Sequence, residues 1–328
     1  MVGHAEPMRI LVGLLLSFSV LCNTPCLLSA ADKVRITTTN LNMTSLTAGV
    51  AVKRGFFRDE GLEVEVIRTT APVTVAALSN GDIDYTMVFG SVVRAAMRGL
   101  PLKVVASFVD SSSLSLVARP EIKTMKDLRG KTLGVSAYGA TTDVVARLMI
   151  RHFDIDPEKE IKVIALGADR ARLSALKEGL IHVAAVSPPV DFEGKSMGFV
   201  ILARAYELFN FPFHGLATHN RKIKERPDEV KRVLKAMIKA SRFIRENREK
   251  AIEVLMQWAR VDRDQAVAAY DSDVRVLNPH GTIPEDGLRL VIEQASKEAR
   301  ITREFSASDV SDQTILQQVQ RELGISGR

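Results

Sequence analysis

The sequence predicts an α/β protein of two similar lobes, each a mostly parallel β-sheet covered by helices. The chain has 328 residues, which suits about two domains of roughly 100–200 residues each. Residues 76–91 are echoed by residues 174–189, with Gly81 and Gly179 at equivalent places 98 positions apart (179 − 81). Each copy has a helix end, a glycine, a buried strand and a loop of small residues. Within the wider order of strand, helix, strand, helix and strand, this predicts a parallel sheet.

The first 31 residues are predicted to be a cleaved export signal. Arg9 precedes the apolar run 10–22, and Ser29-Ala30-Ala31 supplies a small-residue cleavage site. The run has 13 residues, fewer than the roughly 20 that span a bilayer, so cleavage is favoured over the alternative of an uncleaved anchor. Both cysteines, Cys22 and Cys26, lie in this segment. We therefore expect a cysteine-free mature chain in the periplasm.

The two lobes are predicted to repeat one order of elements. The first lobe has a strand at 33–38, a polar loop at 39–44, a helix at 45–54, a strand at 62–67 and a helix at 70–78. The second lobe has a strand at 131–136, a loop at 137–140, a helix at 141–153, a strand at 161–166 and a helix at 168–176. Both a true duplication and a common α/β architecture explain this spacing.

The chain is predicted to cross twice between the lobes. After a β-rich run at 104–108, a second run at 113–119 makes the first crossing, and residues 124–130 form a short helix that ends at a glycine. Residues 211–217 make the return crossing. The first lobe is therefore discontinuous, comprising residues 32–113 and 217–328, whereas residues 114–216 form the second lobe with the hinge crossings.

From Pro227 onward the sequence predicts helices. Acidic residues follow Pro227 in the first helical turn, and apolar residues recur at spacings of three and four through residues 230–244. A second amphipathic helix is predicted at 248–259. Residues 279–281 mark a loop, and two more helices follow it.

The residues favour a binding protein over an enzyme. The six histidines are scattered without metal-ligand spacing, and there is neither a nucleophile elbow nor a nucleotide-binding glycine motif. We interpret His214 and His219 as satisfied or solvated side chains rather than ligands, and Asp82 and Asp84 as solvated at a helix end rather than as an acid–base pair. We therefore expect no metal, no cofactor and no catalytic residue.

The net charge of +6 is interspersed along the chain and does not by itself imply nucleic acid. Residues 221–250 hold 12 Lys/Arg and 5 Asp/Glu but only one aromatic residue, Phe243. Because nucleic-acid binding uses aromatic residues or a groove-entering motif beside such charge, we interpret this helix as a solvated face and expect no nucleic-acid partner.

The predicted ligand site consists of loops at the carboxyl ends of strands, where open α/β sheets bind ligands. Residues 136–143 leave a strand and enter a helix, so their N–H groups and hydroxyls suit an anion or a polarised ring oxygen; alternatively, Thr141 or Thr142 caps its own helix. Arg170 either pairs an anion or lies on the surface. The predicted ligand-binding residues are Asn40, Asn42, Met43, Thr44, Pro72, Phe89, Gly90, Ser91, Ser136, Tyr138, Gly139, Ala140, Thr141, Thr142, Ser187 and Pro188.

The tails of the two echoed segments are expected to face each other across one cleft. Phe89-Gly90-Ser91 ends the first copy and Ser187-Pro188-Pro189 ends the second. Small residues let the backbone approach a ligand, and Phe89 is placed to stack on it. For the proline pair, turn chemistry is an equally good explanation.

Three segments carry a family resemblance. Residues 49–64, 77–84 and 127–135 resemble the sulfonate/nitrate/taurine and thiamine-pyrimidine (NMT1/THI5-like) group of ABC transporter substrate-binding proteins, and residues 226–251 are similar to the C-terminal helices of that group. The resemblance implies the type 2 periplasmic-binding-protein fold, in which two α/β lobes close on one solute. It also implies docking on a membrane permease driven by an ATPase.

Two relatives of this family fit less well. The yeast-type pyrimidine synthases carry a Cys-rich iron motif and an active-site histidine, whereas the mature chain is expected to have no cysteine. The LysR-type regulators carry an N-terminal DNA-binding motif, where this chain has an export signal.

We therefore expect a monomeric extracytoplasmic receptor that delivers a small molecule to an ABC importer. The loops suit a sulfonate, nitrate, a carboxylate or a pyrimidine-like molecule. The alternatives are a ligand-sensing module coupled to a signalling partner and an enzyme on the same fold.

Overall fold

The computed structural model describes residues 1–4, 31–139 and 141–325. Residues 5–30, which hold the predicted apolar run and both cysteines, lie outside the described residues, as does the predicted site residue Ala140. From Ala31 onward the chain forms one compact unit. None of the helices in the described ranges is both long and apolar enough to cross a membrane.

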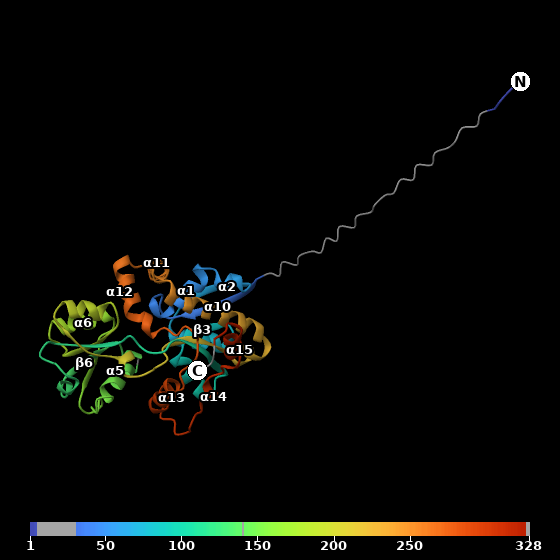
Figure 1. Ribbon diagram of the computed structural model, residues 1–328. Helices are drawn as coiled ribbons and strands as arrows, with labels where there is room; N and C mark the ends of the chain where they lie inside the picture. Colours follow the sequence, from blue (N-terminus) through green and yellow to red (C-terminus); the bar gives the residue numbers. More distant parts are fainter. Residues whose placement is uncertain (5–30, 140, 326–328) are drawn as a thin grey trace. The chain divides into compact units, whose positions relative to one another are not determined.

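Two five-stranded sheets organise this unit, in the orders β2-β1-β3-β10-β4 and β7-β6-β8-β5-β9 (Figure 1). The first sheet consists of β1 (Asp32–Thr38), β2 (Leu62–Arg68), β3 (Tyr85–Val88), β4 (Leu102–Val109) and β10 (His214–His219). The second consists of β5 (Ser115–Ala118), β6 (Thr132–Val135), β7 (Lys162–Ala165), β8 (Val183–Val186) and β9 (Val200–Arg204). In each sheet one strand, β10 or β5, runs antiparallel to both of its neighbours, and the other strands share one direction. The predicted α/β class is thus confirmed, with mixed sheets.

The helices cover these sheets in both lobes. In the first part of the chain they are α1 (Leu46–Lys53), α2 (Phe56–Asp59), α3 (Ala71–Asn80), α4 (Gly90–Met97), α5 (Thr141–Arg151), α6 (Asp169–Lys177), α7 (Val190–Ser196) and α8 (Ala205–Leu208). In the second part they are α9 (Asn220–Glu225), α10 (Pro227–Glu246), α11 (Arg248–Ala259), α12 (Arg263–Asp273), α13 (Glu285–Ala299), α14 (Ala307–Val310) and α15 (Thr314–Glu322). Short 3₁₀ turns lie at η1 (Met43–Ser45), η2 (Met125–Leu128) and η3 (Val274–Val276). Figure 1 shows α5 and α6 with β6, and α1, α10 and α15 near β3.

The 98-residue echo corresponds to equivalent elements. β3 and β8 differ by 98 positions at both ends, and α3 and α6 begin 98 positions apart. Gly81 and Gly179 both follow their helices with left-handed backbones, at φ +85° and +80°. Because side chains disfavour this conformation, both glycines act as helix stops, as predicted.

The return crossing lies earlier in the chain than predicted. β9 ends at Arg204, the chain returns through α8, and His214 to Ala217 already belong to β10. A Cβ atom at Gly215 would lie 2.1 Å from the carbonyl oxygen of Ala106, so this glycine permits the close approach of β10 to β4 rather than a turn. The predicted lobe boundary at 216/217 falls inside β10.

Helix α12 was not predicted. Its five apolar residues are consecutive, from Ala266 to Tyr270, and so form no amphipathic stripe; of these only Ala266 and Tyr270 are buried. By contrast, α11 has the predicted bounds, and the apolar stripe of α10 is buried as predicted.

Strand register brings the predicted loops together. Ile36 of β1 pairs with Tyr85 of β3, so both strands end at the same edge of the first sheet. Leu133 of β6 pairs with Val183 of β8 in the same way in the second sheet. His214 pairs with Val88, which places β10 beside the end of β3.

Candidate ligand-binding cavities

One cavity of about 280 Å³, here called the His214 cavity, is lined by residues from both lobes. The first lobe contributes Thr39 and Asn40 after β1, residues 88–94 around the start of α4, residues 211–214 before β10, and part of α13. The second lobe contributes the loop after β6 and the start of α5. The predicted site residues in its lining are Asn40, Phe89, Gly90, Ser91, Ser136, Thr141 and Thr142.

The loop between β6 and α5 is held by its own hydrogen bonds. The hydroxyl of Thr142 accepts a hydrogen bond from the Ser136 backbone N–H at 3.2 Å and is also bonded to the Ser136 hydroxyl. The buried carboxylate of Asp143 accepts from the Gly139 N–H at 2.9 Å and pairs with Arg147 Nε at 2.6 Å. These bonds join the loop to the first turn of α5 and fix the hydroxyls of Ser136 and Thr142 at the cavity wall.

The region after β3 is a helix start rather than a loop. Gly90 and Ser91 are the first residues of α4, and the Ser91 hydroxyl accepts a hydrogen bond from Arg94 Nη2 at 2.9 Å. Phe89 is buried in the core and forms part of the cavity wall rather than an exposed stacking surface. Arg94 is a cavity residue that the sequence did not single out.

The structure corrects our interpretation of His214 as a satisfied or solvated side chain. The residue is only 5% exposed, and neither ring nitrogen has a hydrogen-bond partner among the described residues. Burial lowers the pKa of His214 to about 4, so the ring is neutral near pH 7. A neutral imidazole has one donor and one acceptor, and each unmet buried group costs about 1–3 kcal/mol. A ligand that bonds to His214 would recover this energy.

A second cavity of about 230 Å³, here called the Asp273 cavity, lies elsewhere between elements of the two lobes. Its lining includes Asn42 and Met43 of the first lobe, Pro188 and Pro189 of the second, and Asp273 at the end of α12. The tails of the two echoed segments therefore line different cavities, Phe89 to Ser91 in one and Pro188 to Pro189 in the other. The expectation that they face each other across one cleft stays a prediction, since Asn40 lines the first cavity and Asn42, two residues later, lines the second.

Arg170 is an exposed residue of α6 at the Asp273 cavity and forms an ion pair with Glu193 at 3.3 Å. This agrees with the second of the two alternatives for Arg170, that it lies on the surface. Asp273 itself was missed, since a lone aspartate at the end of an unpredicted helix carries no sequence signal.

Five predicted site residues belong to the lining of neither cavity: Thr44, Pro72, Tyr138, Gly139 and Ser187. Thr44 donates to the side chain of Asn42 through its N–H at 3.1 Å and its hydroxyl at 2.7 Å, which caps the turn at η1. Pro72 lies in the first turn of α3, where its missing N–H is not needed. Tyr138 is 67% exposed. Local backbone structure is sufficient to explain why Thr44 and Pro72 occur at their positions.

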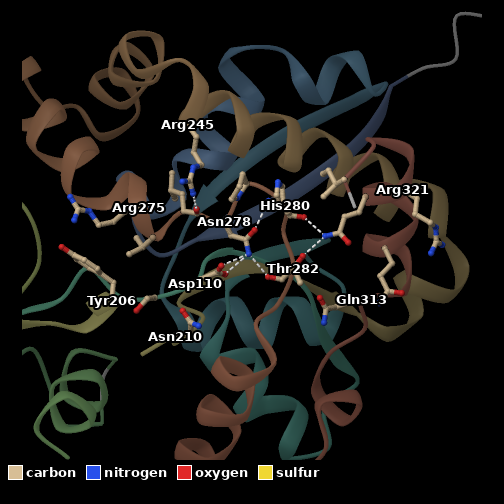
Figure 2. Close-up of a pocket in the computed structure, with 17 residues that line it drawn as sticks. Asp110, Tyr206, Asn210, Arg245, Arg275, Asn278, His280, Thr282, Gln313 and Arg321 are labelled. Carbon is tan, nitrogen blue, oxygen red and sulfur yellow. Dashed lines mark hydrogen bonds between the residues drawn. The ribbon is translucent and has the colours of Figure 1, made fainter. Parts of the chain in front are cut away.

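A larger hollow of about 1060 Å³, here called the hinge groove, is lined by residues of both crossings and of the C-terminal segment (Figure 2). Asn278 lies at its centre. The Asn278 side chain donates to the two Asp110 oxygens at 3.0 and 2.8 Å and accepts from the N–H groups of His280 and Gly281 at 2.9 and 2.8 Å. Burial raises the pKa of Asp110 to about 6, against the lowering effect of hydrogen bonds from Asn278 and Ser107. These groups satisfy one another, which is typical of a structural network.

Comparisons with known proteins identify the family of this chain. The NMT1/THI5-like family model matches residues 42–251, well over half of the chain. The chain belongs to this family. A relative from Brucella abortus (strain 2308), provisionally named a binding protein, is 26% identical over 226 residues, which cover 67% of this chain and 69% of that protein.

Solved structures share the fold of this NMT1/THI5-like protein. The periplasmic sulfonate-binding protein SsuA of Methylobacillus flagellatus KT, provisionally assigned to a sulfonate ABC transporter, aligns with a TM-score of 0.76 at 16% identity, over 91% of this chain and 96% of that chain. The desulfurization enzyme DSZB aligns with a TM-score of 0.63 at 13% identity, over 89% and 99%. The chain thus has the two-lobed periplasmic-binding-protein fold, on which both binding proteins and an enzyme occur.

Proposed function

We propose that this protein is an extracytoplasmic solute receptor that closes on a small polar or anionic molecule and delivers it to the permease and ATPase of an ABC importer. The observation that carries the proposal is the His214 cavity, since strand ends of both lobes line it and a buried, unpartnered imidazole belongs to its wall. Its volume of about 280 Å³ is near the lower end of ordinary small-molecule pockets.

Closure of the lobes would follow from these contacts. A ligand that touches both lobes stabilises the closed arrangement by its differential affinity for it. Two crossings, at residues 110–114 and 205–213, connect the sheets. Such short connections are the usual place for hinge rotation.

Export to the periplasm is part of the proposal. Its support is the predicted cleaved signal and the similarity to a periplasmic sulfonate-binding protein. The ligand class is left at small polar or anionic molecules, since a likeness in fold does not carry a ligand from one protein to another. Catalysis is the second candidate, because the desulfurization enzyme DSZB shares the fold.

A thermal-shift screen tests the receptor proposal. The purified protein is heated with sulfonates, nitrate, carboxylates and pyrimidines, and a true ligand at 100 times its Kd adds about 2.7 kcal/mol to the unfolding free energy. Thr141→Val, which removes a hydroxyl from the His214 cavity, should weaken the response. The control Ser196→Ala removes an exposed hydroxyl outside both cavities and should keep it. Turnover of any of these compounds, with no stabilisation by any of them, would contradict the receptor proposal and favour the enzyme.

A further inference from the structure

We propose that the Asp273 cavity is a subsite for a protonated amine, so that the solute carries an ammonium group beside an apolar body. This inference rests on the proposed solute-binding function and assigns a cationic group to its polar ligand. It differs from the anionic ligands that the loops of the sequence suggest.

The first argument is the state of the Asp273 carboxylate. The residue is 6% exposed, and its Oδ1 atom has no hydrogen-bond partner among the described residues. Hydrogen bonds from the side chains of Ser113 and Ser272 reach the carboxylate, so only part of its acceptor capacity is used. A buried charge is stable only when it is paired and fully hydrogen-bonded. The carboxylate therefore lacks a partner of positive charge.

The second argument is that the neighbouring arginines are engaged elsewhere. Across the cavity, Arg170 pairs with Glu193 at 3.3 Å. Arg275, two residues further along the chain, lies over the ring of Tyr206 at 5.3 Å. Arg204 lies 4.0 Å from Asp191. Within the described part of the chain, no ion pair to Asp273 is formed.

One further acid, Asp191, lies close enough to act on Asp273 through its charge. Asp191, the buried acid of α7, raises the pKa of Asp273 through its charge, although burial is the larger cause and brings the value to about 7. Asp191 itself accepts from the Ser115 hydroxyl at 2.9 Å. A sulfonate or nitrate would be repelled by Asp273 here, whereas an ammonium group would be attracted.

The third argument is the shape and polarity of the walls. Apart from Asp273, the cavity of about 230 Å³ is lined largely by apolar side chains: Met43, Pro188, Pro189, Val190, Leu255, Ala259, Val261 and Ala269. Apolar walls suit an apolar body, and the exclusion of water strengthens the attraction between carboxylate and ammonium. Because both lobes contribute to the lining, an amine bound there also favours closure.

The test compares two probes of one shape on matched variants. Benzylamine carries the ammonium group, and benzyl alcohol has the same body without charge. Calorimetry at pH 7.5 should show benzylamine binding to the wild type and roughly 10- to 100-fold more weakly to Asp273→Asn, as expected for the loss of a charged hydrogen bond. The control Asp271→Asn removes an exposed carboxylate from the same helix, paired with Arg248, and should bind as the wild type does.

Two further measurements test the inference independently of Asp273→Asn. Ala269→Phe fills the cavity while leaving the carboxylate in place, and it should abolish benzylamine binding. Near pH 6.5, binding to the wild type should release protons, which is measured as a dependence of the binding heat on the buffer.

Equal binding of benzylamine to the wild type and Asp273→Asn would overturn the amine subsite. So would stabilisation of the wild type by an anion of the solute screen with no response to benzylamine, and in that case the receptor function would stand. Absence of any response to either class would overturn both proposals.

Discussion

A buried polar atom without a hydrogen-bond partner is destabilising, and such atoms belong to two side chains that line the cavities. His214 has two unpartnered nitrogens and Asp273 one unpartnered oxygen among the described residues. Both are more than nine-tenths buried. In the proposed function a ligand supplies the missing bonds, and without it the two side chains are expected to weaken the fold.

His214→Leu is expected to stabilise the ligand-free protein, most strongly in acid. Burial lowers the folded-state pKa of His214 from 6.5 to about 4, so the unfolded chain binds the extra proton and the wild type loses stability as the pH falls from 6.5 towards 4. At pH 5 the variant should gain about 2 kcal/mol on this account. Urea unfolding at pH 5 and pH 7.5 measures it. An equal effect at both pH values would contradict the assigned pKa shift.

Asp273→Asn should show the opposite pH dependence. The folded-state pKa of Asp273 is raised from 3.8 to about 7, so wild-type stability falls as the pH rises through that window and the loss is complete above it. The variant does not titrate at this position. Its advantage in unfolding free energy should grow from near zero at pH 4 to roughly 4 kcal/mol at pH 8. Urea unfolding across this range is the measurement, and a flat difference would show that folding does not raise the pKa of Asp273.

At the scale of elements, single residues hold neighbouring segments of the chain together. Asn278 joins the first crossing to the C-terminal segment through Asp110, His280 and Gly281. Gly215 lets β10 approach β4 closely. A defect at either place should affect the arrangement of whole strands rather than a single side chain.

Asn278→Ala should destabilise the fold by about 2–4 kcal/mol. The substitution leaves the partly buried Asp110 carboxylate and two backbone N–H groups short of partners, and each unmet group costs about 1–3 kcal/mol when buried. Urea unfolding measures the loss. Gln317→Ala, at an exposed residue of the same groove, is the control and should change stability by less than about 0.5 kcal/mol. A similar result for both variants would show that the network is dispensable.

Gly215→Ala should lower the free energy of unfolding by more than the addition of one methyl group usually does. The added Cβ would lie 2.1 Å from a backbone oxygen of β4, so the strands must move apart, at a cost of at least about 3 kcal/mol by analogy with severe overpacking. Gly90→Ala is the control, since the nearest atom to its Cβ lies 3.8 Å away. The yield of soluble protein and the melting temperature distinguish the two. Wild-type behaviour of Gly215→Ala would contradict the close strand approach.

At the scale of the whole molecule, the two sheets share one design. Each has three parallel strands, then one reversed strand, then an edge strand, and the reversed strands β5 and β10 are those that follow the crossings. Because the loops at the strand ends line cavities shared by both lobes, ligand binding and lobe movement are expected to be coupled.

Ligand binding should therefore make the protein more compact in solution. A ligand found in the thermal-shift screen should reduce the radius of gyration measured by small-angle X-ray scattering, because it favours the closed arrangement. Thr141→Val lacks one hydroxyl of the His214 cavity and should bind the ligand more weakly. A higher ligand concentration should therefore be needed for the same decrease in the radius of gyration. A bound ligand that leaves the scattering curve unchanged would contradict the closure mechanism.

Local sequence patterns were sufficient to predict most of the helices and strands. Glycine stops, hydrophobic periodicity and the 98-residue echo predicted β3, β8, α3, α6 and the bounds of α11, because each of these depends on residues close in sequence. The same patterns predicted the α5 entrance and the loop after β1 as ligand-facing, since strand ends converge wherever parallel strands pair.

The amino-acid sequence by itself thus determined the α/β class, the two lobes and the strand ends that line the His214 cavity. Tertiary structure alone decided that His214 and Asp273 are buried without partners, that Gly215 lies inside a strand, and that the echoed tails line separate cavities. The physical reason is that burial and hydrogen-bond satisfaction depend on residues distant in sequence, as when β10 returns from the second lobe to place His214 beside Val88. A lone histidine or aspartate carries no local pattern that reveals such neighbours.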